Sequence, residues 1–140
     1  MGVAWNTRES KRLVGIVLVS HSFELAHGLA VLASQVAGAE VRIEPAGGAP
    51  DGGLGTSGDS VWEAIVRADC GEGVVVLADL GSSILTVRHL LEEGHANGHV
   101  RLVDAPFVEG AIAAAVMSSA GQHLDDVAQA AEEARGARKL

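Results

Sequence analysis

The stretch Val-Gly-Ile-Val-Leu-Val-Ser-His-Ser at residues 14–22 decides the fold of this chain. Its first six residues carry no polar side chain, which is typical of a central strand in a parallel sheet that helices cover on both faces. A segment of helical period follows, in which large apolar residues recur at spacings of 4, 3 and 4 residues. These are Leu25, Leu29, Leu32 and Val36. The sequence therefore predicts a strand followed by a helix whose apolar face these four side chains form.

The alternation of strand and helix continues along the chain. Further strands are expected at 40–44, 73–78 and 99–103, and further helices at 59–70, 83–93, after Pro106 and at 124–135. The first of these strands alternates polar and apolar residues, which favours an edge position. We therefore predict an α/β three-layer sandwich whose mainly parallel four-stranded sheet, in the order 2-1-3-4, is flanked by helices. It forms a single domain over 13–140, behind a polar tail of residues 1–12.

Two of the expected helices carry more detailed predictions. The helix at 59–70 is expected to begin at Asp59 or Ser60 as the N-cap. Its apolar face comprises Val61, Trp62, Ile65 and Val66. The helix after Pro106 carries its large apolar residues at Val108, Ile112, Val116 and Met117.

Composition excludes several classes of protein. The chain has 140 residues, of which 48% are apolar and 20% charged, as expected for a globular domain. A formal net charge of −8 argues against binding nucleic acid through its phosphates. No apolar run reaches the roughly 18–20 residues that a membrane helix needs. The lone Cys70 fits a reducing compartment, and we expect a cytoplasmic protein.

Two polar motifs follow the expected strands at 14–19 and 73–78. His21 lies in Ser20-His21-Ser22, and Asp79 comes directly after the other strand. These strands are neighbours in the predicted order, so both residues are expected at the carboxyl edge where open parallel sheets bind ligands. A carboxylate that accepts from the Nδ1–H of a histidine leaves Nε2 free as a nucleophile. The alternatives are an ordinary loop histidine and an aspartate that caps a helix.

Small polar residues near these motifs suit an anion. Ser22, Gly81, Ser82 and Ser83 are expected at helix starts, where hydroxyl and backbone N–H groups bind phosphoryl oxygens. The sequence therefore indicates a phosphoryl-binding site beside His21.

The glycine-rich segment 53–58 matches the pattern GxGxxG. A dinucleotide fingerprint needs a tight turn directly after a strand, and this segment follows a proline-containing loop instead. It is either a flexible loop or a loop that folds near His21 and brings Gly55, Thr56 and Ser57 to the site. A second cluster, formed by His89, His95 and His99 with nearby glutamates, lacks zinc-ligand spacing, so no metal site is expected.

Four motifs together resemble a known family. They are Val17–Ser22, Gly55–Ser57, Asp79–Ser82 and Ala105–Ala111, and the resemblance covers about residues 13–135. The chain resembles the mannose-type IIA family of the phosphoenolpyruvate:sugar phosphotransferase system, and most closely its dihydroxyacetone kinase branch. The resemblance implies a histidine phosphorylated on Nε2, which matches His21, and an orienting aspartate, which matches Asp79. It also implies a parallel α/β sheet and a homodimer, for which we expect Ala111–Val116 to contribute to the interface.

The resemblance implies partners as well. The carrier protein HPr is the expected phosphoryl donor, and ADP held on the DhaL subunit is the expected acceptor, so that the ATP formed phosphorylates dihydroxyacetone on DhaK. Because the chain stops at Leu140, we expect the donor to be a separate protein. No cofactor is expected on this chain, since any Mg²⁺ would accompany the nucleotide on DhaL. The alternatives are the IIA component of a mannose-class sugar transporter and a non-catalytic regulatory domain of the same fold.

Overall fold

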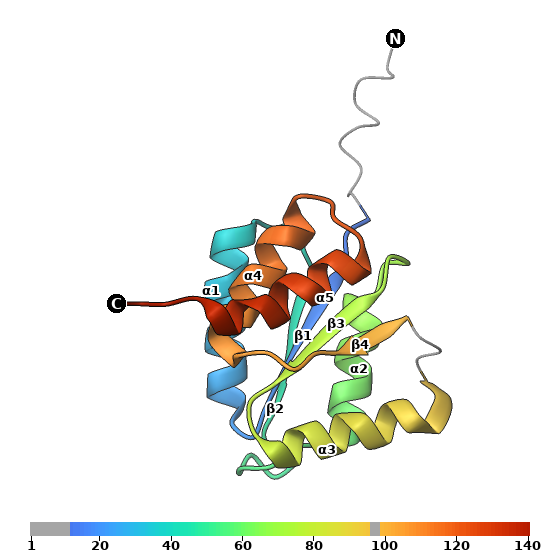
Figure 1. The fold of residues 1–140 in the computed structure, drawn as a ribbon. Coiled ribbons are helices and arrows are strands. Elements are labelled where there is room, and N and C mark those ends of the chain that lie inside the picture. Colours follow the sequence, from blue (N-terminus) through green and yellow to red (C-terminus); the bar gives the residue numbers. More distant parts are fainter. Residues whose placement is uncertain (1–11, 96–98) are drawn as a thin grey trace.

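A sheet of four parallel strands forms the middle layer of the molecule, which is described here by a computed structural model over residues 12–95 and 99–140 (Figure 1). The strands are β1 (Gly15–Ser20), β2 (Ile43–Gly47), β3 (Val74–Ala78) and β4 (Val100–Leu102). They lie in the order β2-β1-β3-β4, and every neighbouring pair is parallel. The predicted fold class and strand order are confirmed.

Helices cover both faces of this sheet (Figure 1). One face carries α1 (Phe23–Ala37), α4 (Phe107–Ser119) and α5 (Leu124–Glu133), and the other carries α2 (Gly58–Ala68) and α3 (Gly81–Leu90). A π-helical turn, Leu91–His95, extends α3, and a 3₁₀ turn, Ala134–Gly136, follows α5.

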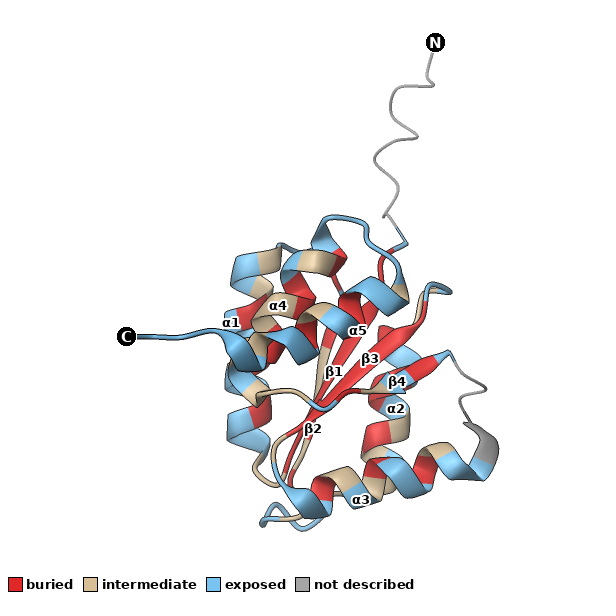
Figure 2. Cartoon of the chain, in the orientation of Figure 1, coloured by how far each residue is buried: buried red, intermediate tan, exposed pale blue. Residues whose placement is uncertain are grey.

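The central strands are buried along their whole length (Figure 2). Because side chains alternate along a strand, Ile16 and Leu18 pack with α1, α4 and α5, whereas Val17 and Val19 pack with α2 and α3. Gly15 permits a close approach of α2, since a Cβ there would lie 2.2 Å from the carbonyl oxygen of Ala68. The two cores fix β1 between both helical layers, and so fix where β1 ends.

The predicted apolar face of α1 is wrong in most of its members. Leu29 is buried, but Leu25, Leu32 and Val36 are about half exposed. The other buried residues of α1 are small, namely Ala26, Ala30 and Ala33. Small side chains let the helix axis lie close to the sheet, so the spacing of the large residues alone identified the wrong face.

The same error affects α4. Val108 and Val116 are exposed, Ile112 and Met117 are partly buried, and the fully buried alanines are Ala111, Ala114 and Ala115. Half of the expected interface stretch, Ala111–Val116, therefore packs inside the subunit.

Three smaller predictions are also corrected. The N-cap of α2 is Ser57, which accepts a hydrogen bond from the N–H of Ser60, so neither Asp59 nor Ser60 caps the helix. On α2, Val61 and Ile65 are buried as expected, but Val66 is exposed. Strand β2 begins three residues later than expected, because its register with β1 runs from Ile43 to Gly47. Its edge position is confirmed.

The expected tail, residues 1–12, lies outside the described residues except for Arg12. Its separation from the domain stays a prediction. Within 12–95 and 99–140, the structure has no helix long and apolar enough to cross a membrane.

Candidate functional site

Strands β1 and β3 end side by side and deliver His21 and Asp79 to the same edge of the sheet. The two connections that leave these strands run to opposite faces, with α1 on one and α3 on the other, so the edge has the geometry of a ligand-binding crevice. His21 Nδ1 lies 3.1 Å from Asp79 Oδ1. The side chain of His21 is 22% exposed and that of Asp79 is 11% exposed. The largely buried Asp79 therefore holds the ring, while part of the His21 side chain remains accessible to solvent.

Three donors besides the imidazole hold the Asp79 carboxylate in place. Oδ2 accepts from the Ser20 hydroxyl at 2.8 Å and from the His21 N–H at 3.2 Å, and Oδ1 accepts from the Leu80 N–H at 2.7 Å and from His21 Nδ1. Burial alone would raise the pKa of Asp79, but the hydrogen bonds from Ser20, His21 and Leu80 outweigh it and lower the pKa below its ordinary value. Asp79 is therefore an ionised acceptor that fixes the proton of His21 on Nδ1.

Ser82 lies on the opposite side of the ring, where its hydroxyl contacts His21 Nε2. It belongs to the first turn of α3, which begins at Gly81 after Leu80 as N-cap, so Asp79 is not the cap of that helix. Ser22 caps α1 and accepts from the Leu25 N–H at 3.3 Å. Two helix N-termini thus flank the histidine, and each favours negative charge. Phosphoryl binding by Ser22, Gly81 and Ser82 stays a prediction.

Ser83 occupies a different position from Ser82. Its side chain is fully buried, and its hydroxyl lies 3.1 Å from His21 Nδ1 rather than beside Nε2. A phosphoryl group on Nε2 could meet Ser83 through its backbone N–H at the start of α3. The Ser83 hydroxyl instead contacts the Nδ1 side of the ring, away from Nε2.

The glycine-rich loop folds onto this site. The Gly55 N–H donates to the His21 carbonyl at 2.9 Å, and the Thr56 hydroxyl lies 2.9 Å from that of Ser83. Ser57 caps α2. Of the two alternatives for the glycine-rich segment, the structure shows the loop that folds near His21, and it brings Gly55 and Thr56 to the site.

Sequence reasoning missed one residue of the site, Ser20. Its side chain is fully buried, donates to Asp79 and accepts from the Ser22 N–H at 3.0 Å. The available signal was a hydroxyl at the last position of an otherwise apolar strand. Such a group requires a buried partner, because an unpaired buried hydroxyl is costly.

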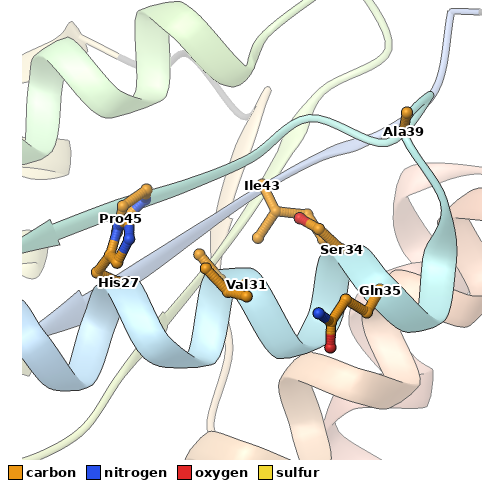
Figure 3. Close-up of a pocket in the computed structure, with 8 residues that line it drawn as sticks. His27, Val31, Ser34, Gln35, Ala39, Ile43 and Pro45 are labelled. Carbon is orange, nitrogen blue, oxygen red and sulfur yellow. The ribbon is translucent and has the colours of Figure 1, made fainter.

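Other concave and titratable features lie elsewhere. A groove of about 430 Å³ runs between α1 and β2, and its lining includes His27, Val31 and Pro45 but not His21 or Asp79 (Figure 3). Among the side chains that the structure describes, no cluster of three or more histidine, cysteine or acidic residues could hold a metal ion. The side chain of His95 lies outside that set. The groove has an apolar lining and one titratable side chain, so the His21–Asp79 pair remains the stronger candidate for chemistry.

Comparison with known proteins identifies related sequences. The model of the EIIA-man family, described as "PTS system fructose IIA component", matches residues 15–128. A relative from Listeria innocua, "PEP-dependent dihydroxyacetone kinase 2, phosphoryl donor subunit DhaM", is 36% identical over 108 residues, which make up 76% of this chain and 86% of that protein. A DhaM from Lactococcus lactis, named as a phosphotransferase subunit, is 31% identical over 85% of this chain and 94% of its own length.

Other relatives are much longer. The DhaM protein of Pantoea ananatis is 39% identical over 133 residues, which cover 91% of this chain but only 28% of that protein. Among solved structures, the unknown-function protein EF1359 superposes with a TM-score of 0.81 at 32% identity, covering 91% of this chain and 98% of its own. The resemblance seen in the sequence is confirmed by these matches.

Proposed function

Because this chain belongs to the EIIA-man family, we propose that it is a phosphoryl carrier that accepts a phosphoryl group on Nε2 of His21 and passes it to an acceptor. The observation that carries the proposal is the orientation of the ring. Nδ1 faces the ionised Asp79, and Nε2 faces the rim of the site beside Ser82. This is the arrangement that a nucleophilic Nε2 requires.

In the accepting step, the lone pair of Nε2 attacks the phosphorus of a donor phosphohistidine. The Nε2–P bond forms, the donor's P–N bond breaks, and its electron pair returns to the donor ring. The ring of His21 then carries the phosphoryl group on Nε2 and a proton on Nδ1, so it is cationic, and the Asp79 carboxylate stabilises that charge. In the donating step, an acceptor atom attacks the phosphorus and the electron pair of the broken bond returns to Nε2.

The beginnings of α1 and α3 supply charge stabilisation for the phosphoryl oxygens. Phosphoryl transfer depends mainly on positioning and electrostatics. The N–H groups of Gly81, Ser82 and Ser83 open α3 and lack intrahelical acceptors, so they suit an anion beside Nε2. The Ser82 hydroxyl would turn from Nε2 to the phosphoryl group once the N–P bond has formed.

The named relatives indicate the system in which the carrier works. We propose that the chain is the phosphoryl donor subunit of a phosphoenolpyruvate-dependent dihydroxyacetone kinase, as its DhaM relatives are named. HPr is the proposed donor, and ADP on DhaL is the proposed acceptor, with Mg²⁺ bound alongside that nucleotide. The ATP would then phosphorylate dihydroxyacetone on DhaK, in the cytoplasm.

A second candidate rests on the description of the family itself. In that case the acceptor would be a histidine of a IIB component, and the matching family is named for a IIA component. A purely regulatory domain is the weaker reading, because a sensor needs no oriented nucleophile.

One experiment tests both the chemistry and the acceptor. The protein is incubated with labelled phosphoenolpyruvate, enzyme I and HPr, and the labelled position is located by ³¹P and ¹⁵N NMR. An acid-labile phosphate on Nε2 of His21 is expected. The labelled protein is then mixed with DhaL–ADP or, separately, with a mannose-class IIB protein. Rapid formation of ATP supports the kinase assignment, rapid transfer to IIB overturns it, and the absence of any label overturns the carrier.

We also propose a homodimer. Large apolar side chains are exposed on two helices that contact each other, and a second copy would cover them: Leu25, Leu32 and Val36 on α1, and Val108 and Val116 on α4. Sedimentation at micromolar concentration should give twice the 14.3 kDa mass. Leu32→Glu should shift the equilibrium to monomer, whereas Leu54→Glu, at an exposed leucine of the glycine-rich loop, should leave it unchanged.

A further inference from the structure

Two hydroxyl groups lie behind the imidazole ring, on the side away from the proposed nucleophile. Ser83 Oγ is 3.1 Å from His21 Nδ1, and Thr56 Oγ1 is 2.9 Å from Ser83 Oγ. Ser83 is fully buried in the first turn of α3, and Thr56 is partly buried in the loop before α2. The contacts therefore run from Thr56 in the glycine-rich loop, through Ser83 of α3, to Nδ1 of the His21 ring.

Asp79 favours a proton on Nδ1, and the direction of these hydrogen bonds either supports or opposes that tautomer. A serine hydroxyl can donate or accept. If Ser83 donated to Nδ1, that nitrogen would need a lone pair, the proton would lie on Nε2, and the nucleophile would be lost. If Ser83 donates its proton to a hydrogen bond with Thr56, the oxygen of Ser83 can only accept from His21 Nδ1–H. Asp79 Oδ1 accepts from the same N–H. A Thr56 hydroxyl that accepts a hydrogen bond from Ser83 therefore favours the tautomer with its proton on Nδ1.

The backbone of the same loop holds the histidine in a second way. The Gly55 N–H donates to the His21 carbonyl, and a β-bridge joins Thr56 to Gly48 at the end of β2. Gly55 has a φ of 147°, and a Cβ there would lie 3.3 Å from that of Ala49. The backbone of Gly55 and the hydroxyl of Thr56 thus tie one loop to both the main chain and the ring of His21.

We propose that Thr56 and Ser83 are positioning residues of the phosphoryl transfer, which hold His21 in the tautomer with its proton on Nδ1 and so keep Nε2 nucleophilic. The proposal rests on the proposed function of His21 as the carrier. It separates the roles of two adjacent serines, with Ser82 beside the nucleophile and Ser83 behind the ring. Removing either hydroxyl should slow phosphorylation of His21 about tenfold, the effect of one hydrogen bond.

The test measures the tautomer directly and does not require transfer. The full chain is labelled with ¹⁵N on histidine, and the Nδ1 and Nε2 shifts of unphosphorylated His21 are recorded in wild type, Ser83→Ala, Thr56→Val and Thr56→Ser. The wild type and Thr56→Ser should show a protonated Nδ1. Ser83→Ala and Thr56→Val should show a larger share of protonated Nε2 and a slower phosphorylation by HPr.

Ser118→Ala is the matched control. Ser118 is also fully buried, but its hydroxyl donates to the Val14 carbonyl at 2.6 Å. Val14 precedes β1, whereas His21 follows the other end of that strand. Ser118→Ala should lower the melting temperature without changing the tautomer or the rate. Unchanged shifts in both Ser83→Ala and Thr56→Val overturn the inference even if the wild type is phosphorylated normally. If Ser83→Ala does not fold, Thr56→Val decides. A wild type that accepts no phosphate contradicts the carrier function instead, and the tautomer result is still read separately.

Discussion

Among the described residues, two histidine–aspartate pairs have nearly equal lengths, and only one has surroundings that suit the proposed chemistry. His21 Nδ1 lies 3.1 Å from Asp79 at the carboxyl edge of the sheet, and His99 Nε2 lies 3.2 Å from Asp69 near the opposite end of β3. The side chains of His99 and Asp69 are 44% and 34% exposed, about two to three times as much as those of the first pair. The two pairs therefore differ in exposure but not in the distance between histidine and aspartate.

The difference lies in what holds each carboxylate. Asp79 accepts from a buried hydroxyl and two backbone N–H groups in addition to its histidine, whereas Asp69 accepts from the Gly71 N–H and from His99. Nε2 of His21, beside Ser82, also faces a helix N-terminus, which stabilises an anion. We therefore expect reactivity from a pair whose acceptor is fixed and whose other ring nitrogen faces a group that stabilises an anion.

The largest expected effect comes from removing each histidine in turn. His21→Ala should abolish phosphorylation by HPr, because the attacking nitrogen is gone. His99→Ala should keep the wild-type rate, measured as label incorporated from phosphoenolpyruvate. Label retained in His21→Ala, or lost in His99→Ala with the fold intact, would reverse the assignment of the two pairs.

Neutralising each aspartate should separate the pairs almost as clearly. Asp79→Asn should fold but transfer about 10²–10⁴-fold more slowly, because an amide cannot stabilise the cationic ring and can hold the wrong tautomer. Asp69→Asn should stay within about twofold of wild type, since its carboxylate is solvated. Single-turnover kinetics with phosphorylated HPr measure both rates. Equal rates in the two variants would show that Asp79 plays no part in the transfer.

Ser20 allows a finer comparison, because among the described residues no hydroxyl group contacts Asp69. Ser20→Ala removes a donor to Asp79, so the pKa of that carboxyl should rise toward its ordinary value. Transfer should slow about tenfold. Ser20→Thr, which keeps the hydroxyl and suits a strand, should restore most of the rate. A pH–rate profile that does not move in Ser20→Ala would argue for a structural role only.

The smallest effect concerns stability in acid. The pKa of Asp79 is lowered in the folded protein, so its ionised form stabilises the fold above the pKa of an unfolded aspartate, about 3.9. That contribution is lost as the pH falls through the lower folded value. Urea unfolding at pH 3–6 should therefore show wild type exceeding Asp79→Asn by a constant amount above about pH 5 and by less below pH 4. A pH-independent difference would contradict a lowered pKa.

The strands, and whether each lies at the centre or the edge of the sheet, could be predicted because local patterns of apolar residues signal them. The apolar run at 14–19 marks a covered central strand, and the alternation at 40–44 marks an edge, even though β2 begins later. The helix faces could not be predicted in the same way. On α1 the large residues are partly exposed and the alanines are buried, because the distance between helix and sheet, rather than hydrophobicity alone, selects which side chains fit between them.

The sequence by itself determined that a histidine and an aspartate follow neighbouring strands, since parallel strands deliver their carboxyl ends to one edge. Only the tertiary structure decided which atoms meet there. The contacts of the site join residues up to 62 positions apart. The Ser20 hydroxyl is buried against Asp79, Ser82 and Ser83 lie on opposite sides of the His21 ring, and Thr56 contacts Ser83. A difference of a few tenths of an ångström in the donor–acceptor distance decides whether a hydrogen bond forms, and the packing of the whole sheet sets these distances.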